Sequence, residues 1–234
     1  MATVDVTRDA PRALKWVYRA LFLLGIGVFL GLLAAGGARA VMDRRPPPLA
    51  YDVFERGNAL ERRGDLAGAA REFRALAAVV PTELHAFDSL ARVLQAGGDQ
   101  DGALAAHRAA LVHHPLSASA RRDLGLALLA RRAWAEAHVH LAAAVRLDPR
   151  DVVALAALGD VRRERGDFAG AIDAYLHALA LRPGDAAFHN KLGIAYALAG
   201  QPAAARARFE EAIRLDPTSG TAPANLSRLT PATP

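Results

Sequence analysis

Histidines and their polar neighbours are the residues of this chain that could support catalysis or bind a metal ion. The sequence has 234 residues, with eight histidines and no cysteine. The absence of cysteine excludes disulfides, thiolate zinc sites and haem attachment through cysteine. His113 and His114 are adjacent, so on a helix their side chains point about 100° apart, and no His-Glu-x-x-His zinc helix occurs. We therefore predict no metal site and no cofactor.

Nucleophilic chemistry has equally little support in the sequence. It contains neither a Gly-x-Ser-x-Gly nucleophile turn nor a glycine-rich phosphate loop. Trp16 and Trp134, which could stack on a ligand, are better explained by a membrane interface and by a helical core. We predict that the protein is not an enzyme. A histidine-based enzyme would need turnover that disappears with a single histidine substitution.

The elements that would position these side chains follow from an internal repeat. Pro81, Pro115, Pro149, Pro183 and Pro217 each follow the last by 34 residues. A strict period of this length indicates stacked helical hairpins. We predict a capping helix and tail at 218–234, after five repeats that cover residues 50–217, at 50–83, 84–117, 118–151, 152–185 and 186–217.

Small residues recur at fixed positions of the repeat, counted from Ala50 as position 1. Position 8 is glycine or alanine, and position 20 is alanine, in all five repeats. Paired helices can approach closely only where the side chains are small, and larger side chains fill the gaps between them. Position 24 supplies these larger side chains as Phe73, Leu141, Tyr175 and Phe209, with His107 as the exception. We expect packing to explain His107 as well.

The turn inside each repeat has its own signature. Position 15 is glycine in every repeat but the third, at Gly64, Gly98, Gly166 and Gly200. Aspartate follows in three repeats, at Asp65, Asp99 and Asp167. A left-handed glycine can end the first helix, and an aspartate can cap the second. The third repeat has Arg132, Ala133 and Trp134 here, so we expect its turn to be strained or built differently.

These columns resemble the tetratricopeptide repeat. The fourth copy carries Leu158-Gly159, Ala171, Tyr175, Ala178 and Pro183, and the fifth carries Leu192-Gly193, Tyr196, Ala205, Phe209, Ala212 and Pro217. The match covers residues 50–217 and is loosest in the first copy, where Arg56 and Leu76 depart from the pattern. The resemblance implies an all-α fold, a right-handed α-α superhelix. Its concave face, lined by the first helix of each pair, would hold peptides or protein surfaces.

The resemblance also implies where a partner would bind. In the family, positions 2, 5, 9 and 12 of the first helices, with position 6 beside them, tend to face the groove. The residues of this chain that we predict to contact a protein or peptide partner there are Asn58, Arg92, Arg122, Asp160, Arg163, Asn190 and Lys191. Asparagine would pair with peptide backbone, and arginine with carboxylates of an acidic or extended segment. The alternative is that these residues only solvate exposed helix faces.

A membrane segment is predicted before the repeats. Residues 20–38 are 19 residues without a charge, and a helix of that length spans roughly 28 Å, close to the thickness of a bilayer hydrocarbon core. We predict a transmembrane helix there, between a basic tail at 1–19 and a proline-rich linker at 39–49. The alternative is a signal peptide cleaved after Ala40, because Ala38-Arg39-Ala40 fits a small-x-small cleavage pattern.

Small residues also mark one face of the predicted membrane helix. Gly27 and Gly31 are four residues apart, and Ala35 follows four residues later. This spacing allows the backbones of two helices to approach, so we predict a helix contact within the membrane at these three residues. The alternative is that glycine is simply common in membrane helices.

Charge is distributed unevenly along the chain. Residues 1–49 carry seven Lys or Arg against three Asp, and the remainder carries 22 against 21 acidic residues. The nearly neutral repeat region argues against nucleic-acid binding, which needs a concentrated basic surface. Four basic residues precede the apolar segment and three follow it, a slight bias towards a cytoplasmic N-terminus.

We predict a single-pass protein of the bacterial inner membrane with the repeats in the periplasm. Its predicted function is that of an interaction scaffold or assembly factor, which binds one partner while the membrane helix holds the pair at the bilayer. The alternative is a structural subunit of a large membrane complex, held by its membrane helix and one end of the array.

Overall fold

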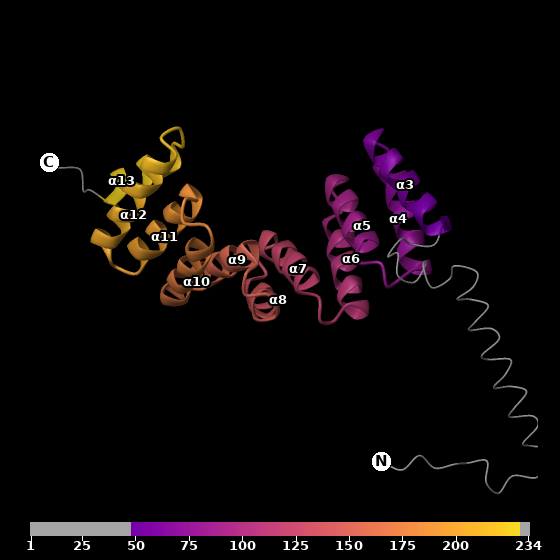
Figure 1. The fold of residues 1–234 in the computed structure, drawn as a ribbon, viewed down its shortest axis with the longest axis horizontal. Coiled ribbons are helices and arrows are strands. Elements are labelled where there is room, and N and C mark those ends of the chain that lie inside the picture. The colour runs from indigo at the N-terminus through magenta and orange to yellow at the C-terminus, as the bar shows by residue number, and fades with distance from the viewer. Residues whose placement is uncertain (1–47, 230–234) are drawn as a thin grey trace, which may run out of the picture. The chain divides into compact units, whose positions relative to one another are not determined.

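The computed structural model describes residues 48–229, which form eleven α-helices and contain no strand. The helices are α3 (Pro48–Arg62), α4 (Leu66–Val79), α5 (Leu84–Ala96), α6 (Gln100–His113), α7 (Ala118–Ala130), α8 (Trp134–Leu147), α9 (Val152–Glu164), α10 (Phe168–Leu181), α11 (Ala186–Leu198), α12 (Pro202–Leu215) and α13 (Thr221–Leu229) (Figure 1). They make five hairpins followed by one further helix. The predicted all-α repeat array with a C-terminal helix is therefore confirmed.

The first helices begin where the repeat pattern predicts. α5, α7, α9 and α11 start at Leu84, Ala118, Val152 and Ala186, each of which is position 1 of its repeat. The exception is α3, which begins at Pro48, inside the predicted linker 39–49. Proline is accepted in the first turn of a helix, because the backbone N–H that it lacks has no partner there.

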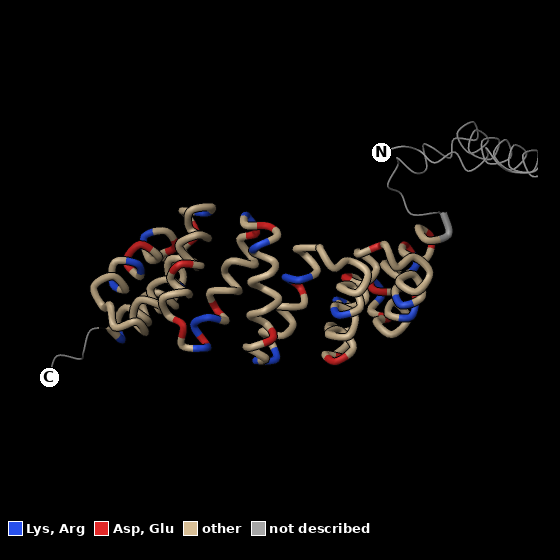
Figure 2. Tube along the Cα trace, turned by 90° about the horizontal axis from the view of Figure 1, so that it is seen from below, with Lys and Arg blue, Asp and Glu red and all other residues tan. Residues whose placement is uncertain are grey.

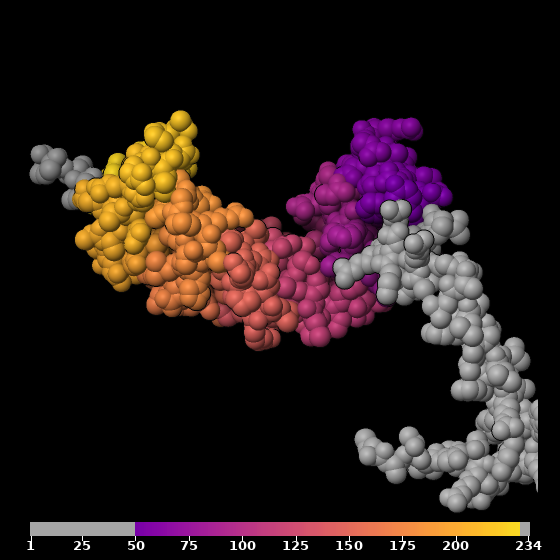
Figure 3. Space-filling model, viewed as in Figure 1, coloured from indigo at the N-terminus to yellow at the C-terminus, as the bar shows by residue number. Residues whose placement is uncertain are grey.

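The hairpins stack in chain order. The two helices of each hairpin pack on each other, in the first hairpin through Phe73 of α4 against Phe54 and Gly57 of α3, and each second helix also packs on the first helix of the next repeat. Residues 52–229 form one compact unit, and Figure 3 shows its repeats as consecutive bands with a hollow between the indigo and yellow ends. The first helices are the elements that could present side chains to a partner in this hollow.

The small residues at position 8 sit against the large residues at position 24. A Cβ added to Gly159 would lie 2.5 Å from Cε1 of Tyr175, and one added to Gly193 would lie 2.5 Å from Cε1 of Phe209. Both distances are too short for a carbon contact, so these helix pairs depend on glycine. The second repeat differs at both positions, with buried Ala91 at position 8 and the smaller ring of His107 at position 24.

The turn between the two helices of the third repeat differs from the other four, as predicted. Gly64, Gly98, Gly166 and Gly200 have φ values of +78°, +83°, +79° and +74°. In the third repeat Arg132 takes the same left-handed conformation with φ +57°, and it is the single non-glycine residue with positive φ in the described chain. The left-handed region costs a residue with a Cβ about 1–2 kcal/mol, so this turn carries strain that the others avoid.

The aspartate caps require a second glycine that the sequence pattern did not single out. Asp65, Asp99 and Asp167 accept hydrogen bonds from the backbone N–H of Gly68, Gly102 and Gly170 at 2.8, 2.8 and 2.9 Å. A Cβ on each of these glycines would lie 2.3 Å from Oδ2 of the capping carboxylate. The third and fifth repeats have neither partner, since Ala133 and Gln201 precede α8 and α12, and Glu136 and Ala204 stand where the three aspartate-capped repeats have glycine.

The hydrophobic core forms three clusters, and no first helix belongs to both of the clusters that meet near the junction between the second and third repeats. One cluster joins Phe73 to Leu90 in repeats one and two, and a second joins Leu124, Leu141 and Leu158 in repeats three and four. Within the described residues, α5 contributes nothing to the second cluster and α7 nothing to the first. Contact across this junction comes instead from α6, whose Leu104 packs into the second cluster.

None of the helices within residues 48–229 combines the length and apolar character needed to cross a bilayer. The predicted membrane helix 20–38, its contact residues Gly27, Gly31 and Ala35, and the alternative cleavage site after Ala40 lie outside the described residues. The last part of the predicted tail, residues 230–234, also lies outside them.

Candidate functional site

The residues predicted to bind a partner all lie on first helices. Asn58 is on α3, Arg92 on α5, Arg122 on α7, Asp160 and Arg163 on α9, and Asn190 and Lys191 on α11. Basic and acidic residues are interspersed along the array rather than separated by sign (Figure 2). The site is therefore a face built from several repeats, with no single dominant charge.

Several of these residues bond to the neighbouring repeat. Arg92 pairs with Glu61 of α3. Arg122 donates to Oδ1 of its neighbour Asp123 and to Oδ2 of Asp151, which caps α9, at 2.9 Å each. Both arginines already have carboxylate partners inside the array. Binding of an acidic partner segment by these arginines would have to displace those carboxylates or share the guanidinium with them.

Asp160 is the most connected residue of this face. Nζ of Lys191 donates to Oδ1 and Oδ2 of Asp160 at 2.7 and 2.5 Å, and the Tyr175 hydroxyl donates to Oδ1 at 2.7 Å. The Tyr175 ring is fully buried, and burial and the Asp160 charge raise the pKa of its hydroxyl above the ordinary value. This cluster bonds α9, α10 and α11 together, so Asp160 and Lys191 hold the fourth and fifth repeats in register.

The remaining predicted residues are bonded locally or to the last helix. Nδ2 of Asn225 on α13 donates to Oδ1 of Asn190 at 2.9 Å, and Arg163 pairs with Glu164 at 2.7 Å. Asn58 is half-buried on α3. The predicted role of all seven residues in binding a partner stays a prediction. The structure adds that most of them connect one repeat to the next.

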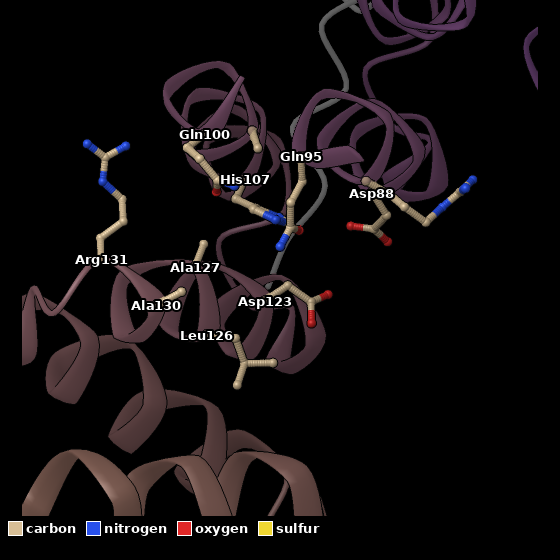
Figure 4. Close-up of a pocket in the computed structure, with 11 residues that line it drawn as sticks. Asp88, Gln95, Gln100, His107, Asp123, Leu126, Ala127, Ala130 and Arg131 are labelled. Carbon is tan, nitrogen blue, oxygen red and sulfur yellow. The ribbon is translucent and has the colours of Figure 1, made fainter. Parts of the chain in front are cut away.

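A cavity of about 370 Å³ opens between the second and third repeats. Asp88, Arg92 and Gln95 of α5 line one side, Asp123 and Leu126 of α7 line the other, and His107 of α6 lies between them. Figure 4 shows the carboxylates of Asp88 and Asp123 on the same side of the gap between α5 and α7, with the Gln95 amide and the His107 ring beside them. The cavity lies beside α6, the helix that contributes residues to both the first and the second core cluster.

Two polar groups in this cavity lack partners. Oδ1 of Asp88 and Nδ1 of His107 are buried and make no hydrogen bond within the described part of the chain. Burial, and secondarily the Asp123 charge, raise the pKa of the Asp88 carboxyl. The other charged or titratable groups that act on it are His85, Arg122 and His114. Burial lowers the pKa of His107, which favours the neutral ring.

The sequence pattern indicated this cavity only indirectly. Position 5 placed Asp88 on the groove-facing side without a role, and packing was expected to explain His107. The signal was that the second repeat alone has alanine instead of glycine at position 8, as Ala91, and an imidazole ring at position 24, as His107. Residues 48–229 contain no group of three His, Asp or Glu side chains arranged to hold a metal ion.

The fold and this face define a class of protein, an α-helical repeat solenoid with a polar face on its first helices. Family models assign the repeats. Residues 159–200 match a model described as TPR repeat, and residues 89–152 and 186–219 match two models described as tetratricopeptide repeat. The chain therefore carries tetratricopeptide repeats, as the columns of glycine, alanine and proline predict. A search of curated proteins finds no match.

Solved structures with a similar fold cover most of the chain. MamA from Desulfovibrio magneticus RS-1 is 21% identical with a TM-score of 0.67, and the alignment covers 74% of this chain and 98% of MamA. YrrB, described as a TPR protein with an unusual peptide-binding site, is 19% identical with a TM-score of 0.65 and coverage of 80% and 95%. PilF of Pseudomonas aeruginosa is 19% identical with a TM-score of 0.64 and coverage of 77% and 82%. At these identities the likeness concerns the fold.

Proposed function

We propose that this protein is a scaffold or assembly factor of the bacterial inner membrane. Its repeats bind a protein or peptide partner along the face formed by the first helices. Residues 20–38 anchor the chain in the bilayer, with the N-terminus in the cytoplasm and the array in the periplasm. Holding the partner next to the membrane raises its effective concentration there, and this role needs no catalytic residue.

The observation that carries the proposal is the bonding of first helices from repeat to repeat. Glu61 with Arg92 and Asp160 with Lys191 connect consecutive repeats, and Arg122 bonds to Asp151, the N-cap at which α9 of the fourth repeat begins. These bonds hold α3 with α5, and α7 with α9 and α11, in a fixed arrangement before a partner arrives. A preorganised face loses less side-chain and backbone entropy on binding than a mobile one, so more of the contact energy contributes to affinity. The peptide-binding site attributed to YrrB gives a precedent on the same fold.

The membrane part of the proposal rests on the uncharged run at 20–38 and its basic flanks. Protease added to intact spheroplasts should digest the array, because the periplasmic side is then exposed. Alkaline carbonate should leave the chain in the membrane fraction. Release by carbonate would instead support cleavage after Ala40, and protection from protease would contradict a periplasmic array.

Site-specific photocrosslinking in native membranes tests partner binding. A photoreactive residue replaces Gln95, which is exposed on the first helix α5, in the full-length chain. The matched control replaces Arg74, which is exposed on the second helix α4. We expect a crosslinked partner, identified by mass spectrometry, from the first position and not from the second.

Two other outcomes would count against the scaffold. Equal crosslinking from both positions would remove the proposed binding face. Crosslinking only from exposed Arg228 on α13, together with aggregation of the purified chain in detergent, would favour the structural subunit held by an array end.

A further inference from the structure

The junction between the second and third repeats is bonded differently from the others. Hydrogen bonds or ion pairs connect α3 with α5, α7 with the cap of α9, α9 with α11, and α11 with α13. No such bond connects α5 with α7 within residues 48–229. This junction therefore lacks the polar connection that each other pair of neighbouring first helices has.

An open cavity occupies the space instead. Its volume of about 370 Å³ is at the lower end of the roughly 300–1,000 Å³ that small-ligand sites occupy. His107 contributes to this space, because it stands at position 24, where the other repeats place phenylalanine, tyrosine or leucine. The cavity is large enough for one long side chain and lies between two groove-facing helices.

The charges around the cavity leave one carboxylate without an ion pair. Arg92 is paired with Glu61, Arg131 with Asp101, and Asp123 with Arg122. Asp88 makes no ion pair within the described residues, and its buried Oδ1 has no hydrogen-bond donor. A partly buried carboxylate without a partner is costly, and a cation supplied from outside would remove that cost.

We propose that this cavity is a subsite for one lysine or arginine side chain of the partner, which enters between α5 and α7 and pairs with Asp88 and Asp123. The inference rests on the proposed function, because the side chain belongs to the segment bound along the first helices. The aliphatic stem lies against Leu126 and Ala127, and the cationic head reaches the carboxylates and the Gln95 amide oxygen. The bound cation bridges α5 and α7 and so completes the missing connection between first helices.

Other occupants fit the cavity less well. An acidic side chain would bring a like charge towards Asp88, while the arginines nearby are already paired. An apolar side chain would leave Oδ1 of Asp88 and Nδ1 of His107 without partners in a drier environment, which is unfavourable for both.

The test uses acetylated and amidated nine-residue peptides of alanine and glycine that differ only at the central residue. The central residues are arginine, lysine, citrulline, norleucine and glutamate. Binding to the full-length chain in detergent micelles is followed by NMR through the signals of Leu126 and His107. We expect the arginine and lysine peptides to bind about tenfold more tightly than citrulline and norleucine, since a charge-assisted pair contributes at least that factor.

Variants of the chain distinguish binding in the cavity from nonspecific binding of basic peptides to the protein surface. Asp88→Asn keeps the size of the side chain and should remove the preference for the basic peptides. Glu210→Gln removes an exposed carboxylate of α12 and should leave it unchanged. Ala130→Phe adds bulk at an exposed position of the cavity lining, so it should weaken binding of the arginine and lysine peptides without disturbing the core.

Several results would overturn the subsite. They are equal binding of the citrulline or norleucine peptide, preference for the glutamate peptide, no binding of any peptide, or an unchanged preference in folded Asp88→Asn. If the partner crosslinks from the Gln95 position equally well in wild type and Asp88→Asn, the scaffold function stands and the subsite fails. If basic peptides bind as expected but no partner is captured in membranes, the subsite stands and the proposed function fails.

Discussion

Replacing Arg132 with glycine should stabilise the array, because the third repeat bends its chain through a residue that the other repeats have as glycine. Arg132 has φ +57°, and the four equivalent glycines have φ between +74° and +83°. Its side chain is exposed and makes no ion pair within residues 48–229, so its loss removes little. The change tests whether the left-handed backbone at this turn lowers the stability of the array.

The expected gain follows from two opposing terms. Relief of the left-handed conformation contributes about 1–2 kcal/mol. Glycine also gives the unfolded chain more conformational freedom, which lowers the free energy of unfolding by about 0.4–1 kcal/mol. The net stabilisation is about 0.5–1 kcal/mol, which for a unit of this size raises the melting temperature by roughly 1–4 °C.

Thermal unfolding of the full-length chain in detergent, followed by circular dichroism, measures this difference. Arg132→Ala is the matched control, because alanine keeps the Cβ and hence the strain, so its melting temperature should stay near that of wild type. The reverse change, Gly166→Arg, should lower the melting temperature by a similar amount. If Arg132→Ala stabilises as much as Arg132→Gly, or if neither differs from wild type, the strain argument is wrong.

Three further predictions concern packing, a hydrogen bond and pH. Gly159→Ala places a methyl group 2.5 Å from the Tyr175 ring and should destabilise the array by about 1–2 kcal/mol in denaturant titrations, after allowing for the better helix propensity of alanine. Gly184→Ala, with no neighbour within 4 Å, is its control and should not destabilise the array, so equal destabilisation by both changes would contradict the packing argument. Tyr175→Phe removes one donor from Asp160 and should cost about 1–2 kcal/mol in the same titrations. Because Tyr175 and Lys191 donate to the same carboxylate, Lys191→Met should cost a different amount in the Tyr175→Phe background than in wild type, and an equal cost would contradict this shared bonding. Because the pKa of Asp88 is raised by burial and by Asp123, the stability that its proton provides is present at low pH and is lost as the pH rises from about 4 through the raised pKa. Asp88→Asn should therefore gain stability relative to wild type between pH 4 and pH 7 in thermal melts, and a difference that does not change with pH would refute this.

Local sequence patterns predicted most of the array correctly. The 34-residue period gave the hairpins, and the first helices from α5 onwards begin at position 1 of their repeats. The buried columns also agree, since Leu124, Leu158 and Leu192 at position 7 are almost fully buried. Even the exceptional turn at Arg132 was predictable, because only the absence of glycine had to be noticed.

Polar contacts between repeats were not predictable in the same way. Arg122 and Asp151 are 29 residues apart, Asp160 and Lys191 are 31 apart, and Asn190 and Asn225 are 35 apart. Each side chain has several rotamers and several neighbours of opposite charge, so a pattern along the chain does not select one pair. For this reason the sequence did not show that most of the residues predicted to bind a partner also bond to other side chains of the array.

The sequence by itself determined the helical hairpins, their number and the residues packed between them, because glycine, alanine and proline constrain the backbone within a few residues of where they occur. Only the tertiary structure decided which charges are already paired and which carboxylate is left unpaired beside a cavity. That outcome depends on how neighbouring repeats pack, since the absence of a hydrogen bond or ion pair between α5 and α7, among residues 48–229, is a property of two helices and the space between them.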